Sequence, residues 1–489
     1  MGSLVHRLAL RQWIRSGLCM WLLVAACRAP ESRVHEENRV AIPDAFAAET
    51  GRDALDIPVG PWWAEFGDPQ LTALVERALV NNRDLQAAAA RVAQAAALAR
   101  MAGGELMPQA GVSLGAGRQR QNFVGFPIPG SGGSVLSTTS TSFGLSLDLS
   151  WELDLWGKLD ARGRAAEADW RASAAQVRGA QLSLAAQIAK AWFALAAIDL
   201  QLDLSRRRVK NATGSTRILR DRYAAGRIPA LDLRASESEL ARESAALAAS
   251  LETRERVTRQ LEVLVGGYPV GLLEGSAQLP EIFGAVPAGL PSDLLERRPD
   301  LLAAAEHLRS LDLSLFESRK TLLPALSLTT SGGRRSAEAS DLTSGAFDIW
   351  SLAANLTQPI FQGGRLRAGV DLADARVREG LANFEQTVLR AFLEVETALS
   401  VTEHQDERVA SLERASHHAQ ASERLAWARY LAGRLEILSV LSARRAALAA
   451  ETAWINARRE RLDTRIDLFL ALGGGFEDER KSASIAAPN

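Results

Sequence analysis

The stretch SFGLSLDLSWELDL, residues 142–155, decides the fold. Its seven odd positions are all apolar and its seven even positions are all Ser, Gly, Asp or Glu, so a β-strand here has one apolar and one polar face. A transmembrane barrel needs such strands, because lipid covers its outside and water fills its inside. At about 3.4 Å per residue the strand crosses a bilayer core even when it is tilted. The alternative is the edge of a soluble β-sandwich.

Three further strands are expected, at about residues 109–118, 325–332 and 348–357. With residues 142–155 they form two hairpins, the first closed by a Gly/Ser/Thr-rich loop at 119–141. Four strands cannot close a barrel, since about eight are needed and open edges are not tolerated in lipid. Two copies would supply eight strands and three copies twelve. The polar strand faces indicate an open bore and favour three copies.

The chain is an internal duplication. The segments RYAAGR (222–227) and LVGG (264–267) recur as RYLAGR (429–434) and ALGG (471–474), both 207 residues later. Earlier in the repeat, NRDL (82–85) resembles RRPDL (297–301) at an offset of 216. The change of offset places a nine-residue deletion in the second copy, in the loop region where insertions and deletions are tolerated.

Long helices fill the rest of each repeat. Residues 159–222 lack Pro and are rich in Ala, Leu, Arg, Gln and Glu, and one helix of that length reaches roughly 96 Å. A helix this long requires a coiled coil or a helical tube. Shorter helices are expected to start near Leu231 and Ile437. The predicted fold is an α+β membrane protein with a duplicated helix, β-hairpin, long helix, helix repeat.

The N-terminus has the pattern of a bacterial lipoprotein signal. Three arginines precede an apolar stretch at 18–26 that is too short to span a bilayer, and LVAAC (23–27) resembles a lipobox. Cys27 is then the acylated first residue of the mature chain, and the other cysteine, Cys19, lies within the signal. Arg28, instead of Asp, favours sorting to the outer membrane. The alternative is an ordinary signal peptide with a chance cysteine.

Charge and composition exclude several function classes. The 57 basic and 58 acidic residues balance, so no nucleic-acid partner is expected. The six His residues have no metal-ligand spacing, and no nucleophile elbow, phosphate loop or acid pair is present. We therefore expect no catalytic residue, no metal and no cofactor. No apolar window of about 20 residues is expected beyond the signal, which leaves the strands to contact the bilayer core.

Five motifs carry a resemblance to a known family. In chain order they are WWAEFGDPQL (62–71), WELDLWGK (151–158), ERRPD (296–300), QPIFQGGR (358–365) and ALGGG (471–475). They resemble the outer-membrane factors of the TolC/OprM/NodT type over about residues 60–475. The resemblance implies a homotrimer with a 12-stranded β-barrel in the outer-membrane lipid, continued by a long α-helical periplasmic barrel. It also implies docking to a periplasmic adaptor and to an inner-membrane pump, commonly of the resistance-nodulation-division class.

The expected domains follow from the repeat and the resemblance. They are a lipoprotein signal peptide (1–26), an acylated tether (27–60), a first repeat (61–268), an inter-repeat equatorial linker (269–291), a second repeat (292–475) and a flexible C-terminal tail (476–489).

The resemblance also implies site residues. The turns Ala225-Gly226-Arg227 and Ala432-Gly433-Arg434 match the periplasmic tips where the family's adaptors dock, with Gly allowing the left-handed turn. The family often has an aliphatic residue after this Gly, whereas both copies here have Arg. The alternative is that the two glycines only break the helices.

The entrance of the family's channel lies at these tips. Rings of Asp constrict it, and the matching positions here are Ser439 and Ser442, with Glu436 as the nearest carboxylate. Asp232 and Tyr430 match residues that link tips in the closed state of some members. We hypothesise a Tyr430 to Asp232 hydrogen bond that helps to shut the entrance. The alternative is a solvated surface pair.

The expected function is the outer-membrane exit duct of a tripartite efflux system for small molecules such as drugs and toxic compounds. Type I polypeptide secretion and metal-cation efflux use the same design and are the alternatives. A periplasmic coiled-coil scaffold explains the helices but leaves the alternating strand at 142–155 unexplained. The inner-membrane pump mainly selects the substrate, so the sequence identifies neither the substrate nor the cognate pump and adaptor.

Overall fold

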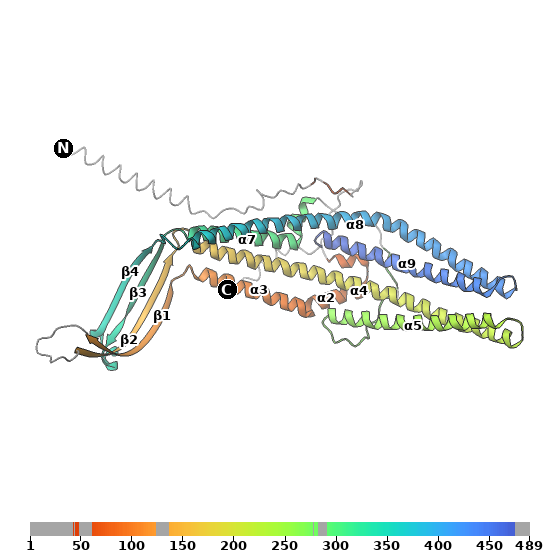
Figure 1. The fold of residues 1–489 in the computed structure, drawn as a ribbon, viewed down its shortest axis with the longest axis horizontal. Coiled ribbons are helices and arrows are strands. Elements are labelled where there is room, and N and C mark those ends of the chain that lie inside the picture. Colours follow the sequence, from red (N-terminus) through yellow and green to blue (C-terminus); the bar gives the residue numbers. More distant parts are fainter. Residues whose placement is uncertain are drawn as a thin grey trace. The chain divides into compact units, whose positions relative to one another are not determined.

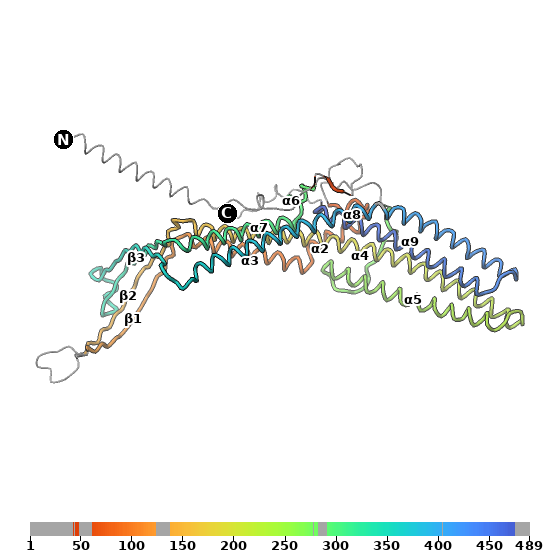
Figure 2. The backbone as a smooth tube through the Cα atoms, turned by 45° about the horizontal axis from the view of Figure 1, so that its top comes forward, coloured from red at the N-terminus to blue at the C-terminus, as the bar shows by residue number. Residues whose placement is uncertain are grey.

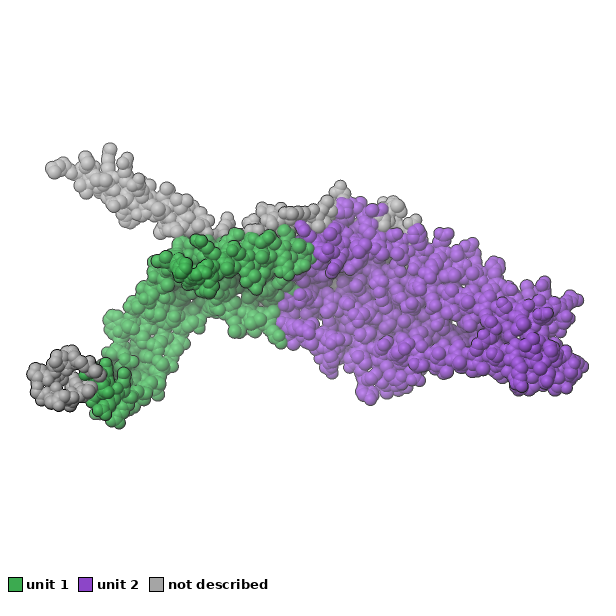
Figure 3. Space-filling view, in the orientation of Figure 1, with its two compact units in different colours: residues 1–38, 93–172, 305–383 green, residues 39–92, 173–304, 384–489 purple. Residues whose placement is uncertain are grey.

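The computed structural model describes residues 43, 45–47, 61–123, 136–276, 278–281 and 291–474. The expected signal peptide, Cys27, most of the tether, part of the linker and the C-terminal tail lie outside these residues. The described chain falls into two compact units, each built from segments of both repeats (Figure 3). The first contains residues 93–172 and 305–383, and the second contains residues 173–304 and 384–474 together with the described residues before 93.

The first unit contains one antiparallel sheet with strand order β1-β2-β3-β4 (Figure 1). The strands are β1 (Gln109–Phe123), β2 (Leu136–Leu153), β3 (Ala325–Ser336) and β4 (Asp348–Thr357). Two short 3₁₀ helices, η4 (Ala339–Thr343) and η5 (Gly345–Phe347), connect β3 to β4. The first hairpin is longer than expected, because residues assigned to the loop at 119–141 continue the ladder. Thr138 to Thr141 favour extended backbone, and they pair with residues 118–121 of β1.

The helices repeat in order, and all but the first of each repeat also match in length. The N-terminal pair of each repeat is α2 (Pro69–Asn81) with α3 (Arg83–Gly104), and α6 (Leu294–Arg297) with α7 (Pro299–Lys320). The later helices are α4 (Lys158–Ala224), α5 (Ala230–Leu264), α8 (Arg365–Leu431) and α9 (Ile437–Ala471). Helices α3 and α7 have 22 residues, α4 and α8 have 67, and α5 and α9 have 35. The predicted duplicated α+β architecture is therefore confirmed.

The second unit has an aromatic core around its 3₁₀ helix η2. The 3₁₀ helix η2 (Trp62–Phe66) places Trp62 in a stack with Phe469 of α9, with ring centres 5.5 Å apart, and Phe66 against Phe193 of α4. Asp68 then caps α2 by accepting from the main-chain N–H of Gln70 and Leu71. Its second oxygen accepts from the Trp192 indole at 2.7 Å, which links the cap to the core.

One 18-residue window of α4 is long and apolar enough to cross a membrane, contrary to the expectation of no such window after the signal. Within the structure, 61% of this window is buried. The apolar composition comes from Ala- and Leu-rich faces that pack against neighbouring helices, so this window belongs to the interior of the helical unit.

Candidate functional site

One face of the sheet is polar. Asp148 of β2 accepts hydrogen bonds from Ser113 of β1 at 2.7 Å and from Ser331 of β3 at 2.6 Å. The register pairs Ser113 with Ser146 and Asp148 with Ser331, so all four residues lie on the same side. This side carries the even positions of residues 142–152, as the alternation predicted.

The opposite face is apolar and uncovered. Leu114 of β1 is 76% exposed and Trp350 of β4 is 83% exposed. Val112, Leu147, Leu352 and Leu356 belong to the same exposed face. A soluble sandwich would bury these side chains under a second sheet, but the described residues form a single sheet. An exposed apolar face of this kind marks a membrane or an oligomer interface.

Two turns of the same design lie at one end of the helices in the second unit, as both backbone views show (Figures 1 and 2). Gly226, with φ of 69°, joins α4 to α5, and Gly433, with φ of 68°, joins α8 to α9. In each turn the N–H of the following arginine donates to a carbonyl five residues earlier, at 2.9 Å. This is the Schellman motif, a helix end in which glycine takes the left-handed conformation. The predicted turn residues therefore occupy equivalent places, and whether an adaptor binds them stays a prediction.

An apolar cluster packs the four helix ends together. It takes one residue each from α4 and α5 and several from α8 and α9: Leu219, Leu233, Ala426, Tyr430, Ile437, Val440 and Leu441. Because the four ends share one core, the two turns are held side by side within this unit.

Tyr430 and Asp232 come close together beneath the turns. Burial, and then the negative charge of Asp232, raise the pKa of Tyr430. Arg222 lowers it, and its guanidinium carbon Cζ lies 6.0 Å from the centre of the Tyr430 ring. Burial also raises the pKa of Asp232, with the Tyr430 hydroxyl acting in the opposite direction. The Tyr430 hydroxyl nevertheless forms no hydrogen bond of normal geometry with a described group. Its ring stacks on Trp427 with ring centres 5.7 Å apart, and this stacking positions the hydroxyl.

The other expected entrance residues lie at the N-terminal end of α9. Glu436 precedes the helix as its N-cap residue, is exposed and makes no capping hydrogen bond with its side chain. Ser439 and Ser442 are exposed on the same helix. Their role at an entrance stays a prediction.

The sequence analysis did not predict a role for Arg444, a buried cation on α9. Its guanidinium donates to Glu423 of α8 at 3.0 Å and to Ser215 of α4 at 3.4 Å, and it lies 5.7 Å from the Trp427 ring centre. A signal was present, because Ile437, Val440, Leu441 and Arg444 follow the spacing of a core-facing helical stripe. An arginine at such a position must find a buried partner.

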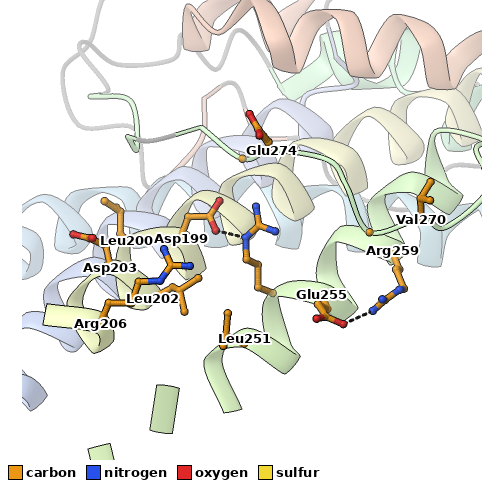
Figure 4. Close-up of a pocket in the computed structure, with 13 residues that line it drawn as sticks. Asp199, Leu200, Leu202, Asp203, Arg206, Leu251, Glu255, Arg259, Val270 and Glu274 are labelled. Atoms are coloured by element: carbon orange, nitrogen blue, oxygen red, sulfur yellow. Dashed lines mark hydrogen bonds and ion pairs between the residues drawn. The ribbon is translucent and has the colours of Figure 1, made fainter. Parts of the chain in front are cut away.

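An open cavity of about 800 Å³ lies beside α4, α5 and the chain that follows α5 (Figure 4). Four of its charged residues form two pairs: Arg254 donates to Asp199 at 2.6 Å, and Arg259 to Glu255 at 2.9 Å. Next to it, the Glu262 carboxylate accepts from the N–H groups of residues 271–273. Burial alone would raise the pKa of Glu262, but these three donors lower it. The contacts anchor the linker to α5.

Comparison with known proteins gives matches along both repeats. A family model described as outer membrane efflux protein matches residues 74–267 and 290–474. The pyoverdine export outer membrane protein OpmQ of Pseudomonas aeruginosa is 33% identical over 473 residues, covering 94% of this chain and 96% of OpmQ. The outer membrane protein OprJ of the same organism is 31% identical over 469 residues, covering 95% and 96%.

Solved structures agree with these matches. The CmeC outer membrane channel of Campylobacter jejuni is 25% identical and has a TM-score of 0.83, covering 94% of this chain and 96% of CmeC. Sequence and structural similarity therefore extend over both repeats and nearly the full length of each relative.

Proposed function

Given that the chain belongs to the outer membrane efflux protein family and is the outer-membrane exit duct of a tripartite efflux system, we propose that three copies close one channel for small molecules. The three sheets join into a 12-stranded barrel, and the helices continue it as a periplasmic barrel. Members of this family are channel proteins, and we infer that this chain is likewise a conduit and has no catalytic activity.

One observation supports the proposal most strongly: the four-stranded sheet has an exposed apolar face, a hydrogen-bonded polar face and two edges, β1 and β4. Lipid tolerates such a sheet only after its edges are paired. Association of identical copies pairs β4 of one with β1 of the next, which leaves the apolar face to lipid and the polar face to water.

The remaining partners are part of the proposal. Acylation of Cys27 anchors each copy to the outer membrane, since each buried acyl CH₂ contributes about 0.8 kcal/mol. The turns at Gly226 and Gly433 dock a periplasmic adaptor, and through it an inner-membrane pump of the resistance-nodulation-division class. The matching family is described as outer membrane efflux protein, and OpmQ is an outer membrane protein of pyoverdine export, which supports efflux over polypeptide secretion.

Purified protein from outer membranes tests this proposal. We expect the unboiled protein to migrate on gels as an oligomer that boiling dissociates, and to form conducting channels in planar bilayers. Protein that migrates as a monomer before boiling and never conducts would contradict the proposal.

A further inference from the structure

The helix turns carry a concentration of positive charge. We define the turn end as residues 213–239 and 420–446, two segments at equivalent places in the repeats. Together they hold ten arginines and six carboxylates, a net charge of +4. The whole chain has a net charge of −1, so the rest of it carries −5. The net positive charge is therefore localised at this end of the helices.

The arginines recur in both repeats, whereas the carboxylates do not. At the offset of 207, three arginine pairs coincide: Arg217 with Arg424, Arg222 with Arg429, and Arg227 with Arg434. None of the six carboxylates has a carboxylate at the equivalent position; Asp232, for example, corresponds to Ser439. Both turns consequently present an arginine directly after the turn glycine.

Most of this charge is not neutralised within the chain. Glu237 pairs with Arg220 at 3.1 Å and with Arg234 at 3.0 Å, and Glu423 pairs with buried Arg444. Five exposed arginines form no side-chain ion pair or hydrogen bond with any described residue: Arg217, Arg227, Arg424, Arg429 and Arg434. Their charges face solvent.

We propose that the turn end attracts anions and makes the mouth of this duct selective for anions over cations. The inference rests on the proposed function, because it needs a channel whose mouth the turn end surrounds. It does not depend on which helix pair borders the lumen, since each has the arginine after its turn glycine. At physiological salt these charges act over about 8 Å, so they affect ions at the mouth itself. A ring of like charge selects ions of the opposite sign.

Reversal potentials of single channels in a KCl gradient test this proposal. The wild type should prefer chloride over potassium. The R227E/R434E variant lowers the net charge of the turn end from +4 to 0. Its chloride-to-potassium permeability ratio should fall by about threefold or more, because each kT of surface potential changes the local ion concentration by about that factor. If that variant fails to assemble, R434Q should shift the ratio in the same direction by less.

Two controls define the interpretation. R227K/R434K keeps the charge of the turn end and should keep the wild-type permeability ratio. R256E/R390E changes the net charge by as much as R227E/R434E, but at exposed helix positions away from the turns, and should change the ratio little. A cation-preferring wild type, or equal shifts in R256E/R390E and R227E/R434E, would overturn the inference. Protein that forms no channel at all would contradict the proposed function instead.

Discussion

Arg298, just before α7, donates a hydrogen bond of 2.8 Å to the main-chain carbonyl oxygen of Ala471, the last residue of α9. The first repeat has the same contact with a different residue: Asn82, before α3, donates at 2.8 Å to the carbonyl of Leu264, the last residue of α5. The donors are 216 residues apart and the acceptors 207, which are the two offsets of the duplication. In each repeat, one side chain thus links the start of the 22-residue helix to the end of the 35-residue helix.

Arg298→Ala should destabilise the assembly more than Asn82→Ala. Arg298 is buried, and its removal costs about 2–4 kcal/mol: most of this is the charge-assisted hydrogen bond to Ala471, and the ion pairs with the half-exposed Asp300 and Glu394 add about 1 kcal/mol or less. Asn82→Ala loses the neutral bond to Leu264 and the cap of α3, in which Asn82 accepts from the Leu85 N–H, at a combined cost of about 1–2 kcal/mol. The temperature at which the oligomer dissociates on gels measures the difference, with exposed Arg83→Ala as the control. Equal effects of the two substitutions would contradict the assignment.

The two faces of β2 should respond oppositely to a charge. Leu147→Arg places a cation on the apolar face and should cost about 2–4 kcal/mol near the bilayer midplane. Ser150→Arg, on the polar face of the same strand, should be tolerated. The yield of folded protein in outer membranes checks both. A Ser150→Arg defect as severe as that of Leu147→Arg would mean that the polar face is not in water.

Buried Glu243 should make stability depend on pH. Burial raises its pKa, although Arg208 at 3.9 Å opposes the shift. The folded protein therefore holds this proton more tightly than the unfolded chain, so its contribution favours folding at low pH and is lost as pH rises through the raised pKa. The stability of the wild type relative to Glu243→Gln should fall from pH 4 to pH 7. A difference that rises with pH would contradict this sign.

Cys27→Ala tests the lipid anchor. Metabolic labelling with a palmitate analogue should label the wild type and leave the variant unlabelled, because Cys27 is the only cysteine expected after cleavage of the signal. Labelling of Cys27→Ala at the wild-type level would refute acylation at this residue.

The tip hydrogen bond hypothesised from the resemblance has its own test. Asp232→Ala should raise the single-channel conductance above that of the wild type if Asp232 helps to close the entrance. Tyr430→Phe serves as the matched variant, since it keeps the stack on Trp427 and removes only the hydroxyl. An unchanged conductance in both variants would remove Asp232 and Tyr430 from the closing mechanism.

The sequence predicted the elements whose signal is local. Alternation over residues 142–155 located β2, and the glycine after each long Pro-free stretch located the turns at Gly226 and Gly433. The extension of the first hairpin was missed, because residues 119–141 read as loop by composition and are ordered in part by cross-strand pairing. The buried contacts of Arg298 and Arg444 were missed because each includes a distant partner, Ala471 at 173 residues and Ser215 at 229, and their nearer carboxylate partners read as ordinary surface ion pairs.

The central claim is that each chain supplies an incomplete sheet that only association of copies can close. Native mass spectrometry of protein extracted from outer membranes in detergent tests this most directly. The account predicts particles with the mass of three chains. Particles with the mass of one chain, in detergent that preserves channel conductance, would contradict it.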